Sequence, residues 1–170
     1  AIGWQVTVVD CRALPETYQR FVIADKVILT HRDIIDQQLS ADENTVAVVM
    51  THNYLDDLEI IKCLLPTSIP YVGVMGSKSR IARIIAQLNP SPNQSEKVSS
   101  PIGLDIGADT PAEIATAIIT EIQAVLAKRN AGSSKYRCQP LHTKETIQQK
   151  RISASDKVNL FEYQKSTSVS

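Results

Sequence analysis

The feature of this sequence that most constrains its fold is the alternation of short apolar runs with longer helical patterns. Four runs rich in valine and isoleucine cover residues 5–10, 26–30, 45–51 and 70–75. Apolar residues then recur at helical spacings of three and four in two segments, at Leu55, Leu58, Ile61 and Leu65 and at Ile81, Ile84, Ile85 and Leu88. Such alternation predicts an α/β fold with a doubly wound, mostly parallel sheet.

The strongest local signal is the tetrapeptide T-P-A-E at residues 110–113. Thr110 can cap a helix, Pro111 suits its first position, and Glu113 can return a hydrogen bond to the Thr110 amide. We therefore predict a long, core-facing helix that ends near residues 128–132. Its expected apolar face is Ile114, Ile118, Ile122 and Val125, broadened by Ala115, Ile119 and Leu126. The polar stretch at residues 89–100 is predicted to be a surface loop.

Length and charge favour one domain and a tail. The chain has 170 residues, and residues 1–130 carry all of these patterns. Residues 131–170 are polar and basic, with seven Lys or Arg against three Asp or Glu. We expect this tail to be weakly ordered apart from a short strand at residues 158–163.

Composition excludes several function classes. Lys plus Arg and Asp plus Glu each number 18, so no net field attracts nucleic acid or a membrane surface. No apolar run could span a bilayer, and no signal peptide is recognisable. Three dispersed cysteines form no metal or redox pair. We expect a cytoplasmic protein with no metal site.

Ligands of open parallel sheets bind beyond the carboxyl ends of the strands, and polar residues follow all four runs. Asp10 could accept hydrogen bonds from ribose hydroxyls or cap a turn, and the pattern does not decide between them. No G-x-G-x-x-G is present to support a dinucleotide site. The segment 76–80, with Gly76, Ser77 and Arg80, could bind an anion, although an ordinary helix cap is slightly favoured.

Three further candidates follow from the pattern. His52 and Asp56 would share a face if a helix began at once, with His52 an acid/base group or simply a hydrogen-bonded histidine. Asp105 lies in the segment 103–109, which could bring backbone and carboxylates to a ligand or Mg²⁺, or form a tight turn. Cys11 could be a nucleophile or sulfur carrier, but a small buried residue is the favoured interpretation.

Taken together, these segments resemble one family, the xanthine dehydrogenase accessory (XdhC/CoxI) proteins, in their C-terminal Rossmann-like domain. The similarity covers about residues 2–127 and rests on four blocks in order. These are G-W-Q-V-T-V-V-D at 3–10 with Arg12, M-T-H at 50–52 with Asp56, Y-V-G at 71–73 through G-S-K-S-R at 76–80, and P-I-G-L-D-I-G-A at 101–108 with T-P at 110–111 and E-I-A at 113–115.

The resemblance implies a maturation factor for molybdenum hydroxylases of the xanthine dehydrogenase type. Such a protein would bind molybdenum cofactor, assist its sulfuration and deliver it to the apoenzyme, with a cysteine desulfurase and a second copy as further partners. The cofactor-binding positions that it implies are Asp10, Arg12, Thr51, His52, Asp56, Gly76, Ser77, Arg80, Gly103, Asp105 and Gly107. A cofactor-insertion chaperone without turnover is the leading interpretation, and no catalytic residue is assigned.

The sequence departs from the family in lacking the upstream glycine loop and first strand of the Rossmann-like domain. In the doubly wound order that strand is central, so residues 5–10 should either pair directly with residues 45–51 or keep an open edge. We expect lower stability than in a chain extended upstream. The alternative function is an NAD(P)-dependent oxidoreductase or dinucleotide-binding module, and a third is an interaction segment with a broken ligand site.

Overall fold

The computed structural model describes residues 2–12, 14, 16–39, 41–136 and 138. The chain divides into two compact units, residues 1–131 and residues 132–170. In the second unit the described residues include one short 3-10 helix, η2 (Ser134–Tyr136). The strand predicted at residues 158–163 lies outside the described residues, as does most of the predicted tail.

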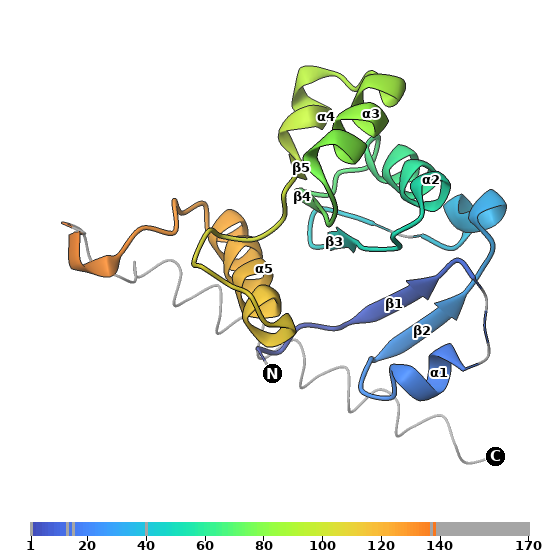
Figure 1. Cartoon of the computed structure of the whole chain (residues 1–170), viewed down its shortest axis with the longest axis horizontal. Coiled ribbons are helices and arrows are strands. Elements are labelled where there is room, and N and C mark those ends of the chain that lie inside the picture. Colours follow the sequence, from blue (N-terminus) through green and yellow to red (C-terminus); the bar gives the residue numbers. More distant parts are fainter. Residues whose placement is uncertain (1, 13, 15, 40, 137, 139–170) are drawn as a thin grey trace, which may run out of the picture. The chain divides into compact units, whose positions relative to one another are not determined.

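The first unit contains five described strands in two parallel sheets (Figure 1). β1 (Thr7–Asp10) pairs with β2 (Lys26–Leu29). β3 (Val46–Val49) pairs with β4 (Tyr71–Val74), which also pairs with the two-residue β5 (Val98–Ser99). All four predicted strands are confirmed, each within the predicted bounds, and the fold is α/β with parallel sheets. The described strands form two sheets where one was predicted.

The two sheets are connected by side chains. Among the described strands, β1 pairs only with β2 and β3 only with β4, so β1 and β3 keep open edges. Trp4, just before β1, packs on the cluster around Tyr71 and Ile118. Cys11, just after β1, is buried in the cluster that contains Val49. Of the two predicted outcomes for the first strand, the open edge is therefore observed.

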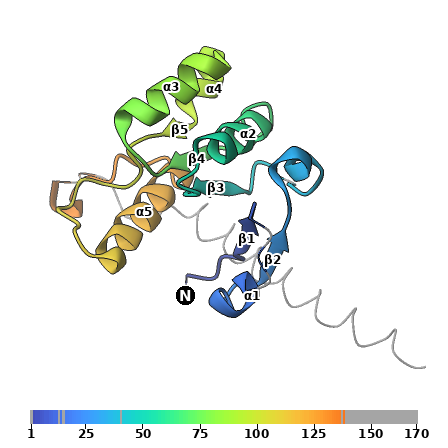
Figure 2. The same ribbon diagram turned by 45° about the vertical axis from the view of Figure 1, so that its right-hand side comes forward.

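Helices cover both faces of the β3–β4–β5 sheet. Val72 and Val74 belong to one buried cluster, formed with α2 (Tyr54–Leu64) and α3 (Lys78–Leu88). Tyr71 belongs to a second cluster, formed with α5 (Pro111–Leu126). Because alternate residues of a strand point to opposite faces, the two clusters lie on opposite sides of the sheet. Figure 2 shows α2 and α3 on one side of the strands and α5 on the other, as a doubly wound fold requires.

Helix α5 confirms the predicted start but has a narrower buried face than predicted. Thr110 and Glu113 form the expected capping box, with Pro111 in the first turn. Only Ala117, Ile118 and Ile122 are buried. The prediction that the face extends further was wrong, because Val125 of the expected face, and Ile119 and Leu126 that should broaden it, remain 39–43% exposed. The helix also ends at Leu126, earlier than predicted.

The prediction of a surface loop at residues 89–100 was wrong. This stretch contains α4 (Pro92–Glu96) and then β5. Ser91 and Gln94 form a capping box with Pro92 in the first turn, the same device that starts α5. Helix α4 was not predicted because its sequence is polar. A short surface helix can form with a cap and without an apolar face. Val98 then pairs with Val72 at the edge of the sheet.

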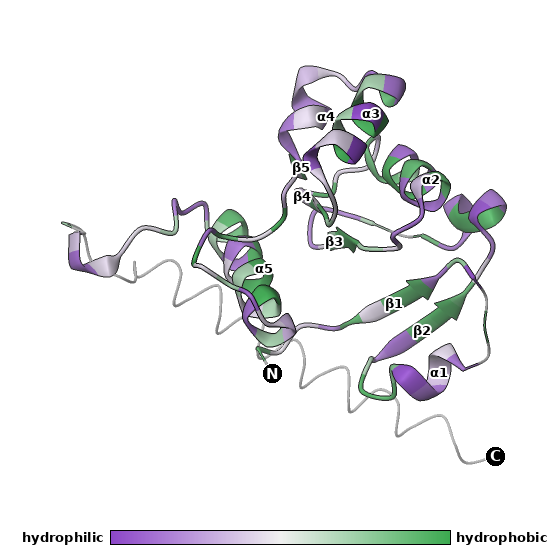
Figure 3. Ribbon diagram, viewed as in Figure 1, coloured by the Kyte–Doolittle hydropathy of each residue, from purple (hydrophilic) through white to green (hydrophobic). Residues whose placement is uncertain are grey.

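The first sheet has little helical cover. Its helix α1 (Thr17–Arg20) has four residues, and η1 (Arg32–Gln37) is a short 3-10 segment that packs against α2. Figure 3 shows apolar residues in the turn between α1 and β2, where Val22 and Ile23 are 76% and 95% exposed. In the described part of the chain, no helix has both the length and the hydropathy needed to cross a membrane.

Candidate functional site

Asp10 ends β1 with both carboxylate oxygens occupied. Arg12 donates two hydrogen bonds to Oδ1, from its backbone N and from Nε, and one to Oδ2 from Nη2. Each donor–acceptor distance is 3.0 Å. The Thr17 hydroxyl also donates to Oδ2. Hydrogen bonds from the Arg12 side chain first, opposed by desolvation, and then from Thr17 and the Arg12 amide lower the pKa of Asp10 to about 2. Asp10 is thus an ionised anchor for the turn after β1, while the Arg12 side chain remains 57% exposed.

The carboxyl ends of β2 and β3 are joined by an ion pair. Arg32, two residues beyond Thr30, places Nη1 2.9 Å from Oδ1 of Asp56 in the first turn of α2. Asp56 is buried, so this contact ties η1 to the helix that follows β3. Asp56, predicted as a ligand contact, is therefore already paired with an arginine of the same edge.

His52 and Asp56 do not share a helix face, because the condition for it, a helix that begins immediately after β3, is not met. Helix α2 begins only at Tyr54, because Asn53 is its cap and accepts hydrogen bonds from the Leu55 and Asp56 amides. His52 precedes the cap in a left-handed conformation with φ of 60°. Few non-glycine residues adopt this region, and such strain concentrates at functional sites. The imidazole is exposed at the end of β3.

A buried carboxylate, Asp57, connects the ends of β3 and β4. Its side chain is fully buried. Thr51 donates to Oδ1 over 2.5 Å, and Arg80 Nη2 lies 3.0 Å from Oδ2. The same Nη2 donates to the carbonyl of Met75 over 2.7 Å. Because the Arg80 contact with Oδ2 is close but not aligned as a hydrogen bond, its attraction is mainly electrostatic.

Gly76 makes room for the Arg80 side chain. Its φ is 153°, and a Cβ there would lie 2.5 Å from Nη2 of Arg80. The glycine at the end of β4 thus allows the guanidinium to fold back under the turn. Arg80, predicted as a direct anion contact, is engaged with Asp57 and Met75 and has 21% of its side chain exposed.

Ser77 has the cap geometry that the sequence favoured. Its hydroxyl accepts from the Arg80 amide over 3.3 Å and lies 3.2 Å from the Ser79 hydroxyl. Ser77, Lys78 and Ser79 are all exposed at the start of α3. This helix start therefore presents two hydroxyl groups to solvent at the carboxyl edge of the sheet.

The segment 103–109 is anchored by Glu121 of α5, which sequence analysis missed. Its Oε2 accepts from the Gly103 amide over 2.7 Å and from the Tyr71 hydroxyl over 2.6 Å. Ser99 donates to Oε1 over 2.9 Å. Burial, and then the adjacent Glu121 carboxylate, raise the pKa of Tyr71 well above its usual range. Nothing in the spacing along the sequence indicated this junction, because its members are up to 50 residues apart.

The structure brings together part of the predicted set. Thr51, Asp56 and Arg80 belong to the contacts around the first turn of α2, with His52, Gly76 and Ser77 in the adjoining turns. Asp10 and Arg12 form their own pair after β1. Asp105 and Gly107 are exposed in the segment before α5. Sequence analysis missed Arg32, Asp57 and Glu121, which hold the turns in place.

Cys11, just after β1, is a poor candidate for thiol chemistry. Cys11 is buried, as the favoured interpretation predicted, and burial together with the nearby carboxylates raises its pKa to about 11. A thiol of that pKa is protonated at neutral pH and is a poor nucleophile. In the part of the chain that the structure describes, no cluster of three or more His, Cys, Asp or Glu residues could hold a metal ion.

Comparison with known proteins matches this architecture. Residues 1–122 match the family model of the XdhC Rossmann domain. A protein of Bacillus subtilis (strain 168) described as a probable subunit of xanthine dehydrogenase is 33% identical over 120 residues, which are 71% of this chain and 35% of that protein. A solved structure described as a xanthine dehydrogenase from Bacillus halodurans is 28% identical with a TM-score of 0.65, covering 78% of this chain and 39% of that one.

The chain therefore spans little more than a third of the length of these two relatives. The family match, by contrast, covers most of the chain and includes the strand ends described above. The resemblance inferred from the four sequence blocks is confirmed. The chain belongs to the XdhC family and contains its Rossmann domain.

Proposed function

We propose that this chain acts in the maturation of molybdenum hydroxylases of the xanthine dehydrogenase type. In this role it binds molybdenum cofactor as cargo, assists its sulfuration and helps to insert it into the apoenzyme. The observation that carries the proposal is the XdhC Rossmann match over residues 1–122, together with the names of the two relatives. The partner is a xanthine dehydrogenase-type apoenzyme.

The chemistry of the carboxyl edge supports an anionic cargo. Molybdenum cofactor carries a phosphate, and phosphate is held by cations, hydroxyls and helix N-termini. Exposed candidates at this edge are Arg12, His52 and Ser77. The buried carboxylates would repel a phosphate if unpaired, but Asp10 and Asp57 each lie against an arginine. The residues present therefore fit a phosphate-bearing ligand.

The cysteines bear on the sulfuration step. Burial raises the pKa of Cys11 to about 11, and burial is also the main cause of the raised pKa of Cys63. Neither thiol is suited to carry sulfur as a thiolate at neutral pH. The third cysteine, Cys138, is exposed. We propose that a cysteine desulfurase supplies the sulfur while the chain holds the cargo, alone or with a second copy.

The test is activation of a molybdenum hydroxylase apoenzyme supplied with molybdenum cofactor, a cysteine desulfurase and cysteine. Adding the 170-residue chain should raise the hydroxylase activity and the fraction of sulfurated cofactor. Ser77→Ala with His52→Asn should reduce this gain, whereas Arg129→Gln, which changes an exposed charge on the segment after α5, should not. An unchanged hydroxylase activity on adding the chain would contradict the proposal.

The same samples test the dinucleotide alternative. A hydride-transferring enzyme needs an acid/base group beside its substrate, and exposed His52 is the candidate at this edge. We expect no oxidation of NAD(P)H with small carbonyl substrates. NAD(P)H turnover that disappears in His52→Ala, without activation of the hydroxylase, would favour the oxidoreductase function.

A further inference from the structure

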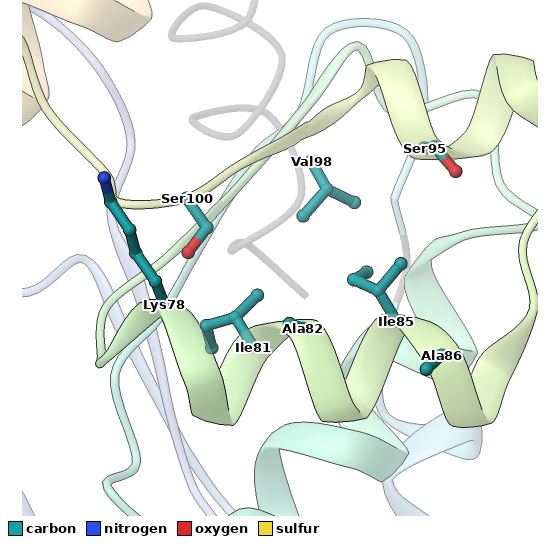
Figure 4. A pocket seen from close by; sticks show the side chains of 8 residues that line it. All are labelled: Lys78, Ile81, Ala82, Ile85, Ala86, Ser95, Val98 and Ser100. Atoms are coloured by element: carbon teal, nitrogen blue, oxygen red, sulfur yellow. The ribbon is translucent and has the colours of Figure 1, made fainter.

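An open pocket of about 510 Å³ lies between α3 and the segment that runs from α4 through β5 (Figure 4). This volume is within the range of small-molecule sites. Its lining includes none of the residues assigned above as cofactor-binding, although Lys78 directly follows Ser77 at the start of α3. Six of the lining residues carry the argument, namely Lys78, Ile81, Ala82, Ile85, Val98 and Ser100.

The body of the pocket is apolar. Ile81 and Ile85 lie one turn apart on α3, and Val98 faces them from β5 (Figure 4). Ala82 and Ala86, also on α3, have side chains too small to fill the space in front of the helix. The pocket is open to solvent, and covering its apolar lining with the apolar part of a ligand is favourable. It suits the flat or chain-like apolar part of a small molecule.

Two polar groups lie together at one end of the pocket. The stem of the Lys78 side chain passes beside Ser100, with its nitrogen at the outer end, and the Ser100 hydroxyl points toward Ile81 (Figure 4). Ser100 Oγ is buried and has no hydrogen-bond partner among the described residues. A buried hydroxyl in that state is unfavourable, and a bound acceptor would satisfy it.

The end of the pocket near Ser100 carries a positive charge. Lys78 is the charged residue of the lining, and no carboxylate is among the lining residues. The Lys78 ammonium, on a long exposed stem, and the unpaired Ser100 hydroxyl can both donate hydrogen bonds to a single anionic group. The apolar body and the cationic end together describe an amphipathic ligand.

We propose that this pocket binds a small amphipathic anion. Its carboxylate, sulfonate or phosphate group accepts hydrogen bonds from Lys78 and Ser100, and its apolar part lies over Ile81, Ile85 and Val98. The site does not depend on Arg12, His52 or Ser77. The binding test can therefore fail while the proposed function is supported, and the proposed function can fail while the pocket binds the anion.

The probe is 8-anilino-1-naphthalenesulfonate, an aromatic monoanion, titrated into the 170-residue chain and followed by its fluorescence. Ala82→Trp, which fills the pocket from an exposed helix position, should weaken binding at least tenfold. Lys78→Gln should weaken it about tenfold and Ser100→Ala severalfold. The matched control is Arg83→Gln, which removes a positive charge from α3 outside the pocket and should leave the affinity unchanged.

A neutral analogue, N-phenyl-1-naphthylamine, should bind at least tenfold more weakly and should not respond to Lys78→Gln. Circular dichroism of each variant checks that the helices are retained. The proposal is overturned if the anion does not bind, or if its affinity is the same in Ala82→Trp. It is equally overturned if Lys78→Gln and Arg83→Gln behave alike.

Discussion

The two parallel sheets of this chain are built from similar apolar runs but differ sharply in burial. Every residue of β4 is buried, whereas β1 buries only Asp10 and β2 has no fully buried residue. Strand β4 has neighbours on both edges and helices over both faces, while β1 and β2 each pair with a single described strand. Burial of a β-branched run is therefore decided by its neighbours more than by its composition.

The two charged pairs at the carboxyl edge differ in burial in the same way as the two sheets. The β1 pair, Asp10 with Arg12, is local and half open to solvent. The pair beyond β3 and β4, Asp57 with Arg80, joins two elements, and its carboxylate is fully buried. We expect the first pair to shape one turn and the second to hold the edge together.

The largest loss of unfolding free energy is expected from a substitution in the core of the second sheet. Ile61 on α2 is fully buried, and Ile61→Ala should lower the free energy of unfolding by about 4 kcal/mol. Val8 in β1 is half-buried, and Val8→Ala should cost about 1 kcal/mol. Urea denaturation of both variants measures this. Equal losses would contradict the difference in burial between the two sheets.

The next effect comes from the buried ion pair. Asp57→Asn leaves the Arg80 charge without its partner, and we expect a loss of about 2–3 kcal/mol, since the arginine is partly exposed. Asp57→Asn combined with Arg80→Gln should cost less than the sum of the single changes. A double-mutant cycle by urea denaturation measures the coupling, and strictly additive losses would contradict a stabilising link between β3 and β4.

A smaller loss of stability is expected from a substitution where the loop after β5 packs on β4. A Cβ at Gly73 would lie 2.3 Å from Cδ1 of Ile102. Gly73→Ala should therefore cost about 1–3 kcal/mol through overpacking. Adding Ile102→Ala to Gly73→Ala should recover part of that loss in thermal unfolding. If the double variant is less stable than both single variants, the close approach of Ile102 does not limit this position.

The smallest effect concerns the pH dependence of the first sheet. Because Arg12 lowers the folded-state pKa of Asp10 to about 2, this carboxylate stabilises the fold above its unfolded pKa near 3.8. The contribution is lost as the pH falls toward 2. Arg12→Gln should raise the Asp10 pKa toward its ordinary value, measured by NMR titration of the carboxyl carbon. A pKa that stays near 2 in this variant would assign the shift to Thr17 and the backbone.

Much of this fold was predictable because the signals were local. The four strands and the start of α5 follow from β-branched runs and from a capping box at Thr110. The equivalent box at Ser91 was overlooked because the helix that it starts has no apolar face. A cap is therefore a sounder indicator of a helix start than the composition of the segment that follows.

The candidate edge was predicted in position but not in its contacts. Polar strand ends located His52 and Ser77, and both are exposed there. The sequence did not indicate that Arg80 turns back to Asp57, or that Tyr71 and Gly103 meet at Glu121. These contacts depend on how α2, α3 and α5 pack on the sheet, and that information is not carried by spacing along the chain.

The two sheets share one carboxyl edge, but the buried core is built mainly on the second sheet, and this is the central claim. Native-state hydrogen exchange tests it residue by residue, because it reports the free energy of local opening. We expect the amides of Val72 and Val74 in β4 to open only with global unfolding. Those of Val8 in β1 and Ile28 in β2 should open more readily, by about 2 kcal/mol or more. Equal protection of β1 and β4 would contradict the claim.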